Sequence, residues 1–290
     1  MAVALAQALA SRRKNAVVIN ADSAQVYADL RVLSARPMPE EMRGIDHRLF
    51  GTWDGAQACS AADWAEAAKR EIEIVQAEGA VPILVGGTGL YIRTLLDGIA
   101  PVPEIDPQIR EGVRTLTVAD SYAALQEEDP ERAAKLAPGD AQRIGRALEV
   151  VRSTGRTLGQ WQEENSGGIA SDVTLAPLVL MPDRAELYER CDARFARMME
   201  NGAVAEVSAL LERGLHADLP VMRAIGVTEI AALLRGELGR DEAIALGQTA
   251  TRKYAKRQFT WLRHQPPAEW PRLRPEYVDI AQIFEILFPE

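Results

Sequence analysis

Two short apolar segments, each followed at once by small polar residues, constrain the fold of this 290-residue chain more than any other feature. The first is Ala16–Asn20, followed by Asp22, and the second is Val81–Val85, followed by Gly86. Their length and β-branched residues predict buried strands rather than helices. In open parallel sheets, ligands bind beyond the carboxyl ends of the strands. We therefore expect a ligand site where these two segments end.

Helical patterns alternate with these segments. Residues 1–12 predict an amphipathic helix ahead of the first strand. Ser60 and Asp63 have the spacing of a capping box, with Asp in place of the usual Glu, and predict a helix that ends at Ala77. A further helix is expected from Leu90 to Leu96. Strands and helices in this order predict an α/β fold, with a parallel sheet covered by helices.

The pattern changes after prolines at positions 101, 103 and 107. From there to Glu164 no segment predicts a strand, and we expect helices over 107–117, 119–127, 130–136, 140–154 and 157–164. A strand is expected again over 173–181, followed by helices to about Arg263. We therefore expect an α/β core of residues 1–103 and 172–290, interrupted by a helical insertion at 104–171.

Composition excludes several classes of protein. The net charge of −9 argues against sequence-independent coating of nucleic acid but leaves room for a local basic groove. No apolar run reaches the roughly 20 residues of a membrane helix, and the first residues lack a signal-peptide pattern. Cys59, Cys191 and three scattered histidines lack metal-ligand spacing. We expect a cytoplasmic protein that is not bound to a membrane.

The residues after each strand have two interpretations. Asp22 has the residue type and position to accept a proton or to hold a metal-bound water, and it also suits a structural turn. The turn that begins with Gly86 and Gly87 precedes a helix, where backbone N–H groups and the helix dipole favour an anion. Glycine also serves tight strand-to-helix turns through its geometry alone.

Two segments carry clustered basic residues. In 140–149, Arg143 and Arg146 are three residues apart and share a helix face, with Gln142 beside them. This arrangement suits contacts with phosphates and base edges, while a solvated face with Arg146 paired to Glu149 is the alternative. Residues 249–263 hold five basic and no acidic residues, interleaved with aromatics. They indicate a polyanionic ligand, or a solvated amphipathic helix, or, less simply, a membrane-surface helix.

Together these segments resemble the tRNA dimethylallyltransferases. The family's D-S-x-Q-V-Y, V-G-G-T-G-L-Y, D-x-Q-R-x-x-R-A-L-E and A-x-R-Q-x-A-K-R-Q-x-T-W-L-R motifs correspond to residues 22–27, 85–91, 140–149 and 250–263. Shorter matches lie at 47–49, 59–64 and 106–110. Because the matches follow the family's order along almost the whole chain, their combination is far more specific than any one motif.

The resemblance implies a fold and a reaction. The fold is a P-loop NTPase-like parallel sheet core, of a nucleotide-binding type, with an all-helical insertion that grips the tRNA anticodon stem-loop. The reaction moves a dimethylallyl group from dimethylallyl diphosphate to the exocyclic amine of the adenine 3′ of the anticodon. That base would be flipped out of the stack into a channel. Mg²⁺ is the implied cofactor, and we expect a monomer.

The resemblance also implies roles for residues. Asp22 would be the general base, Thr88 would lie at the reaction centre, and Arg223 would lie near the diphosphate. The implied tRNA-binding residues are Asp22, Ser23, Ala24, Gln25, Arg110, Gln142, Arg143, Ile144, Gly145 and Arg146.

The chain departs from the family pattern in three places. The family opens with a strand and a G-x-T-x-x-G-K-[ST] loop that cradles the diphosphate and its Mg²⁺, whereas this sequence starts at the helix that would follow this loop. The metal-binding residue is therefore unknown, and we expect residues 1–290 to bind dimethylallyl diphosphate weakly. Leu33 replaces a family glycine, and Thr228 replaces a second arginine.

Two other functions fit parts of the pattern. One is a tRNA-binding protein without catalysis, and the other is a different P-loop transferase, such as a small-molecule kinase. The basic helix at 249–263 argues against a kinase, because a small acceptor needs no long basic surface. Stem-loop binding measured beside prenyl transfer separates the three.

Overall fold

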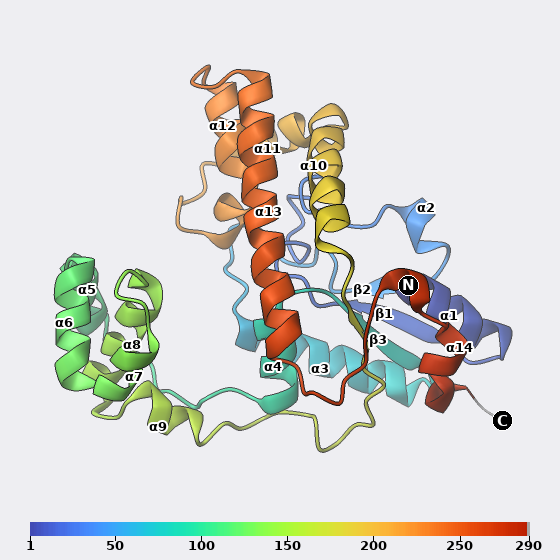
Figure 1. Cartoon of the computed structure of the whole chain (residues 1–290), viewed down its shortest axis with the longest axis horizontal. Helices are drawn as coiled ribbons and strands as arrows, with labels where there is room; N and C mark the ends of the chain where they lie inside the picture. Colours follow the sequence, from blue (N-terminus) through green and yellow to red (C-terminus); the bar gives the residue numbers. More distant parts are fainter. Residues whose placement is uncertain (289–290) are drawn as a thin grey trace. The chain divides into compact units, whose positions relative to one another are not determined.

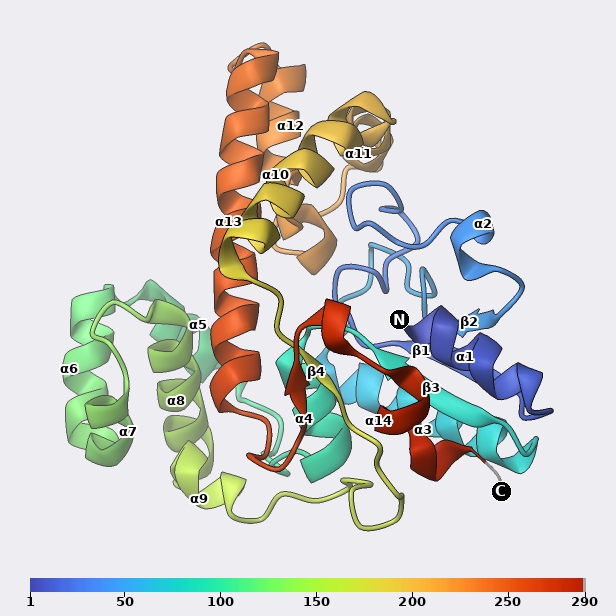
Figure 2. The ribbon, with the colours of Figure 1, turned by 45° about the vertical axis from the view of Figure 1, so that its right-hand side comes forward.

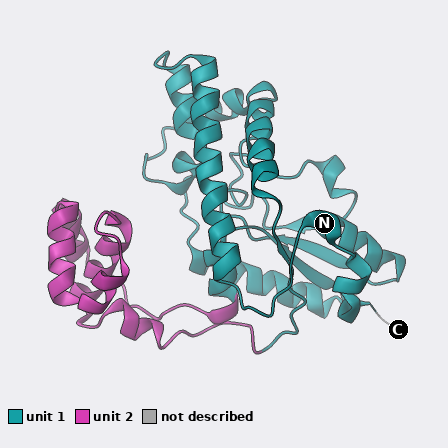
Figure 3. Cartoon of the chain, viewed as in Figure 1, with its two compact units in different colours: residues 1–95, 172–290 teal, residues 96–171 magenta. Residues whose placement is uncertain are grey.

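The computed structural model describes residues 1–288. Two compact units divide the chain (Figure 3). Unit 1 comprises Met1–Leu95 and Asp172–Glu290, and unit 2 comprises Leu96–Ser171. Unit 2 begins at Leu96, ahead of residue 104, where the sequence pattern placed the junction. None of the helices within residues 1–288 is both long and apolar enough to cross a lipid bilayer.

Unit 1 is built on a parallel sheet of three strands in the order β2-β1-β3 (Figure 1). β1 (Ala16–Asn20) and β3 (Val81–Val85) have the predicted bounds, and they pair from Ala16 with Val81 to Asn20 with Val85. The two strands therefore end side by side. β2 (Asp46–Arg48) pairs with the other edge of β1 and was not predicted, because its three polar residues carry no apolar alternation.

Helices cover this sheet on both sides. α1 (Ala2–Ser11) buries Leu5 and Leu9 against β3 and against α14 (Ile280–Ile283), while α3 (Ala61–Ala77) lies on the opposite side of the strands (Figure 2). The N–H of Asp63 donates to the Ser60 hydroxyl, and the Asp63 carboxylate accepts the Ser60 N–H. The predicted capping box thus begins α3.

The second part of unit 1 is helical. α10 (Arg184–Glu200) and α12 (Val227–Leu234) pack against the long α13 (Arg240–His264), and α11 (Ala203–Glu212) packs on α10 and α12. Figures 1 and 2 both show α13 running from this helical group down to α4 (Gly89–Asp97). The shorter helices are α2 (Pro39–Met42), η1 (Pro220–Arg223), η2 (Pro275–Tyr277) and η3 (Glu285–Leu287).

The strand expected over 173–181 is much shorter than predicted. Only β4 (Val179–Leu180) pairs, in parallel with β5 (Arg272–Leu273). Proline explains the difference, because Pro177 lacks an N–H for a ladder and the partner strand lies between Pro271 and Pro275.

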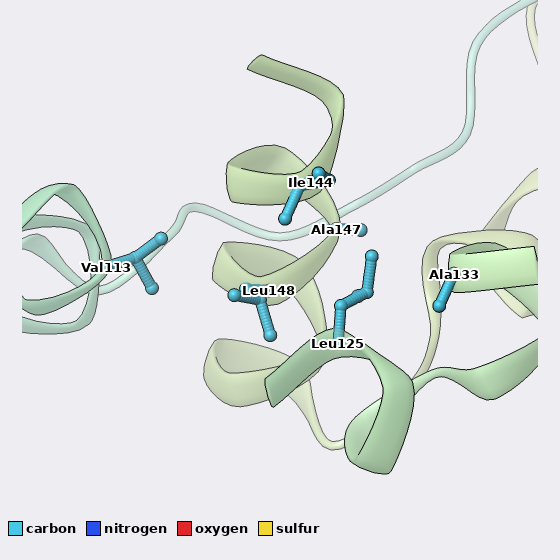
Figure 4. Packing of buried hydrophobic residues seen from close by; sticks show 6 residues of the cluster. All are labelled: Val113, Leu125, Ala133, Ile144, Ala147 and Leu148. Carbon is cyan, nitrogen blue, oxygen red and sulfur yellow. The ribbon is translucent and has the colours of Figure 1, made fainter. Parts of the chain in front are cut away.

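Unit 2 is all-helical, and no strand ladder occurs within residues 96–171. A buried hydrophobic cluster on four of its helices, α5 to α8, forms the core (Figure 4). Each helix begins at an Asp or Thr whose side chain accepts a backbone N–H, which is the preferred N-cap chemistry. The helices are α5 (Pro107–Thr115), α6 (Val118–Glu128), α7 (Pro130–Lys135), α8 (Ala141–Thr154) and α9 (Leu158–Gln162).

Gly247 tests the packing of α13 on α10. A β-carbon at this position would overlap the ring of Phe195. We expect Gly247→Ala to destabilise unit 1 by about 1–3 kcal/mol despite the better helix propensity of alanine. Gly112→Ala is the matched control, because it lies in α5 with no atom within 4 Å of the place that a β-carbon would take, and it should stabilise unit 2 by about 1 kcal/mol. Denaturant unfolding measures both, and stabilisation by Gly247→Ala would contradict the packing.

Candidate active site

A buried asparagine shapes the turn after β1. Asn20 is fully buried, and its Oδ1 accepts the N–H of Asp22 at 2.9 Å. Its Nδ2 donates to the carbonyl oxygens of Asp22, at 3.0 Å, and Leu49, at 3.1 Å. The indole N–H of Trp64 donates to the Asn20 carbonyl at 2.9 Å. The turn that carries Asp22 is therefore fixed from the core side by one side chain.

The Asp22 carboxylate is partly exposed at this turn. Its Oδ1 accepts the N–H of Ala24 at 2.8 Å. Burial raises the pKa of Asp22 above 3.8, and the N–H groups of Ala24 and Gln25 and the positive charge of Arg194 oppose that rise. A carboxylate with a raised pKa is a better proton acceptor near neutral pH than an ordinary one.

Thr88 joins the turn after β3 to the turn after β1. Its Oγ1 accepts the N–H of Ser23 at 2.9 Å and lies 3.2 Å from the Ser23 hydroxyl oxygen, to which it donates. Its own N–H donates to the Ala21 carbonyl at 3.2 Å. The two strand ends therefore form one polar site with a carboxylate and two hydroxyls.

Close packing accounts for the glycines of the second turn. A β-carbon on Gly86 would overlap the backbone of Ala21, and β-carbons on Gly87 and Gly89 would overlap the side chains of Gln258 and Trp261. The Gln258 amide donates to the Gly87 carbonyl at 3.1 Å. Glycine thus lets β1 and α13 approach this turn, which supports the geometric interpretation, and anion binding by the turn stays a prediction.

Tyr254 of α13 completes the site. Burial and then the negative charge of Asp22 raise the pKa of Tyr254, and the polar side chains of Thr88, Gln258 and Ser23 partly oppose the rise. Tyr254 was not predicted from the sequence, because the basic residues of its segment dominate the pattern. Its i, i+4, i+7 spacing with Gln258 and Trp261 was the available signal.

The basic residues of α13 have other partners. Arg252 forms an ion pair of 2.6 Å with Asp192 on α10, and the Arg257 guanidinium lies 5.5 Å from the centre of the Tyr254 ring. These contacts favour the interpretation of α13 as an amphipathic helix with an aromatic face in the protein. The positive charge of Arg252 is therefore paired with a carboxylate of unit 1.

The loop after Asp22 is braced by two side chains. The Gln25 amide nitrogen donates to the carbonyls of Ser34 and Ala35, each at 3.1 Å, so this side chain stabilises the loop. The carboxylate of Glu206 on α11 accepts the N–H groups of Val32 and Leu33, each at 2.9 Å.

Leu33, which departs from the family pattern, is buried. Its Cδ1 would lie 2.7 Å from a β-carbon on Gly226, so Gly226 makes room for it. The substitution is therefore accommodated within unit 1.

The two arginines near this region differ from expectation. Arg223 is exposed at the end of η1, and its guanidinium donates to the Asp218 carbonyl. Its place beside a diphosphate stays a prediction. Arg194, exposed on α10, is the cation whose charge acts on Asp22, and it was not predicted from the sequence. No local pattern marks Arg194, because it lies far from Asp22 along the chain.

Residues expected to contact RNA from unit 2 lie on α5 and α8. Arg143 pairs with Asp140 at 3.2 Å, while Arg146 and Arg110 approach Glu149 at 3.8 and 4.0 Å. All three guanidinium groups remain substantially exposed. The predicted alternative, a solvated face with an Arg146–Glu149 pair, is therefore present, and such surface pairs are weak enough to exchange for phosphate.

Two neighbours of these arginines are placed differently. The side chain of Ile144 is fully buried in the core of unit 2, and contact of this residue with tRNA stays a prediction (Figure 4). A β-carbon on Gly145 would lie 3.9 Å from Val113 of α5, an ordinary contact distance, so packing does not require glycine at this position. Gln142, which is exposed, lines with Gly145 and Arg146 a cavity of about 440 Å³ that Val113 and Leu116 also border.

The described residues do not make a complete magnesium site. Within residues 1–288, no group of three or more His, Cys, Asp or Glu side chains is placed to hold a metal ion. Asp22 stands beside hydroxyls, and its Oδ1 already accepts an amide hydrogen bond. The expected Mg²⁺ is therefore assigned to no residue of this chain.

The fold and site define an α/β protein with a carboxylate and two hydroxyls at its strand ends, together with a second unit that is all-helical. The sequence profile of the family described as "IPP transferase" matches residues 25–265. The chain belongs to this family, and the predictions of family, α/β fold class and transferase activity are confirmed.

The chain is similar to curated relatives over nearly its whole length. The tRNA dimethylallyltransferase of Novosphingobium aromaticivorans is 67% identical, over 95% of this chain and 99% of the relative. The tRNA dimethylallyltransferase of Erythrobacter litoralis is 61% identical, over 99% of this chain and 91% of the relative.

Solved structures share the fold. The tRNA isopentenylpyrophosphate transferase of Bacillus halodurans matches with a TM-score of 0.67 and 30% identity, over 98% of this chain and 88% of that chain. A eukaryotic dimethylallyltransferase, described as acting on tRNA, matches with a TM-score of 0.74 and 27% identity, over 90% of this chain and 65% of that chain.

The raised pKa of Asp22 predicts that its ionised form costs stability. Because the folded-state pKa lies above 3.8, the folded protein binds this proton more tightly than the unfolded chain does. The stability from the protonated form is therefore present below about pH 3.8 and is lost as the pH rises through the folded-state pKa. Asp22→Asn keeps an acceptor for the Ala24 N–H without the charge, so it should unfold at a higher temperature than the wild type near neutral pH.

Thermal unfolding of Asp22→Asn across a pH series checks this expectation. The gain in midpoint should shrink as the pH is lowered toward about 4. Glu73→Gln, an exposed carboxylate-to-amide change on α3, is the matched control and should change the midpoint little. A midpoint for Asp22→Asn equal to or below that of the wild type near neutral pH would contradict the raised pKa.

Proposed function

We propose that this protein transfers a dimethylallyl group from dimethylallyl diphosphate to the exocyclic amine of the adenine 3′ of the anticodon in tRNA. The observation that carries the proposal is the Asp22 carboxylate, whose pKa is raised by burial, fixed beside the hydroxyls of Ser23 and Thr88. Membership of the IPP transferase family and the names of the relatives support the same reaction.

The chemistry needs one proton acceptor and one site for developing negative charge. A carbon–nitrogen bond forms between the adenine amine and the first carbon of the dimethylallyl group as the carbon–oxygen bond to diphosphate breaks. Diphosphate leaves with the electron pair, and Asp22 accepts the amine proton. Because negative charge grows on the leaving diphosphate, fixed cations and N–H groups near it stabilise the transition state. Arg223 is our proposed cation for this role.

The tRNA is proposed to bind through two sets of residues. Ser23, Ala24 and Gln25, next to Asp22, would border the flipped adenine. Arg110, Gln142, Arg143 and Arg146 would bind the anticodon stem-loop from unit 2. Their exposure supports this role, because guanidinium groups held only in weak surface pairs are available to phosphates.

Asp22→Asn tests the proposed general base. The amide cannot accept the proton, so we expect single-turnover prenyl transfer to fall by about 10²–10⁴-fold while tRNA affinity changes little. Transfer of radiolabelled dimethylallyl to a stem-loop, beside a filter-binding titration, measures both quantities. Glu73→Gln should match the wild type. Near-normal transfer by Asp22→Asn would leave Asp22 as a turn residue, and an equal fall in affinity would mean that it only positions the base.

Replacing both Arg143 and Arg146 by alanine tests the RNA-binding face of unit 2. We expect weaker stem-loop binding and a shallower salt dependence, by about 0.7–0.9 in the logarithmic slope for each phosphate that the variant no longer neutralises. Lys135→Ala removes an exposed positive charge from α7 and serves as the control. Binding with unchanged affinity and salt slope in the double variant would show that this face is only solvated.

A further inference from the structure

We propose that the cavity lined by α5, α6 and α8 of unit 2 binds one unstacked nucleotide of the RNA loop, and that Gly145 keeps this cavity open. This inference rests on the proposed function, because it adds a site for a base to the arginine face through which unit 2 is proposed to bind the stem-loop. The proposed place of the target adenine is beside Asp22 in unit 1, so the nucleotide in this cavity is a different one.

The cavity has the size of a ligand site and reaches into unit 2. Its volume is about 440 Å³, which lies within the roughly 300–1,000 Å³ of small-molecule sites. Arg114 and Gln142 line it and are exposed, whereas Val113 and Ser121, which also line it, are only 4% and 6% exposed. A ligand can therefore enter from the surface and contact side chains of the interior.

The lining combines apolar surface with charge. Its large apolar side chains are Val113, Leu116 and Val118. Arg114 and Arg146 add positive charge, and the Glu149 carboxylate accepts hydrogen bonds. A phosphate alone would gain nothing from the apolar side chains, and an apolar ligand would gain nothing from the arginines. A nucleotide uses both, because its base packs on apolar or guanidinium surfaces and offers N–H groups at its edge, while its phosphate pairs with arginine.

The residues of α8 that line the cavity share one face of the helix. Gln142, Gly145, Arg146 and Glu149 are spaced at i, i+3, i+4 and i+7. Arg146 and Glu149 form an ion pair of only 3.8 Å on this face, and Arg146 is 45% exposed. Such a pair contributes little to stability, so a phosphate can take the place of the carboxylate and leave Glu149 for the base edge.

Gly145 has no structural reason to be glycine. It lies inside α8, where glycine costs about 1 kcal/mol relative to alanine, and its φ is outside the left-handed region. Within residues 1–288, a β-carbon there would meet only Val113, at 3.9 Å. Gly112 of α5 also lacks close neighbours, so a helical glycine alone decides nothing. Gly145 differs from Gly112 because it lines the cavity, where any side chain would take space from a ligand.

Gly145→Leu tests whether the cavity holds a base. The leucine would fill the cavity from α8, so we expect stem-loop affinity to fall by about 5- to 50-fold, as for the loss of one bound base. Gly112→Leu is the matched control, because a β-carbon there has no atom within 4 Å and Gly112 lies outside the cavity lining. It should bind the stem-loop as the wild type does. Affinity of Gly145→Leu within about twofold of the wild type would overturn the proposal.

Stem-loops that each lack one loop base identify the occupant. In the wild type, removal of the base that enters the cavity should weaken binding about as much as Gly145→Leu does. In Gly145→Leu, removal of the same base should have little further effect. If Gly145→Leu instead weakens binding of the intact stem-loop and of every abasic one equally, the leucine obstructs the RNA backbone, and the proposal is overturned.

Gly145→Ala tests the role of the glycine in the fold. Because alanine favours a helix and its methyl group has room, the midpoint of thermal unfolding should rise, as for Gly112→Ala. Stem-loop affinity should fall for Gly145→Ala and stay unchanged for Gly112→Ala. A lower midpoint for Gly145→Ala than for the wild type would mean that the fold itself needs this glycine, which would overturn the proposal.

Prenyl transfer measured beside binding separates this inference from the proposed function. A wild-type protein that binds the stem-loop without transferring a dimethylallyl group would overturn the proposed reaction, and the abasic series would still decide the role of the cavity. A wild-type protein that transfers the group, with no coupling between Gly145→Leu and any loop base, would overturn this inference alone. A wild-type protein that binds no stem-loop would overturn both.

Discussion

The hydrogen bonds of one buried side chain, Asn20, organise the site. Asn20 is the last residue of β1, so the sheet fixes its backbone, and its amide then fixes the turn that carries Asp22. The same amide reaches the end of β2 through Leu49, and Trp64 of α3 donates to the Asn20 carbonyl. The bonds with Leu49 and Trp64 are buried, and a buried polar group costs free energy if left unpaired. The sheet, its covering helix and the turn that carries Asp22 are thereby joined at a single residue.

The site places conflicting demands on the same few residues. Burial that raises the pKa of Asp22 makes it a better base and at the same time lowers the stability of the ionised folded protein. Tyr254, Thr88 and Ser23 concentrate hydroxyl groups around that carboxylate instead of apolar packing. Proteins commonly accept such local costs where a function needs a preorganised polar site.

Sequence patterns predicted the elements whose structure depends mainly on residues close together in the chain. β1 and β3 have the bounds expected from their β-branched runs, and Ser60 with Asp63 begins α3 as the capping box predicts. β2 escaped prediction because its three residues gain their order from pairing with β1 and not from their own pattern. The strand over 173–181 failed for a related reason, since its partner offers only two residues.

The site was predictable only in part, and helix geometry explains the errors. The turns after β1 and β3 were expected to meet because both strands are parallel, and the contact between Thr88 and Ser23 joins them. Ile144 was grouped with its neighbours in a motif, although one residue along a helix turns the side chain to a different face, here into the core. Tyr254 and Arg194 reach Asp22 from distant helices, and no single segment of sequence contains that information.

The packing of α13 limits how this chain can change in length. Its contact with Phe195 at Gly247 and its contact with the glycine turn at Gln258 lie on one uninterrupted helix. Inserting or deleting a single residue between them would rotate one contact face by about 100° relative to the other, because a helix has about 3.6 residues per turn. The number of residues between Gly247 and Gln258 is therefore fixed, because both contact faces must meet their partners at the same time.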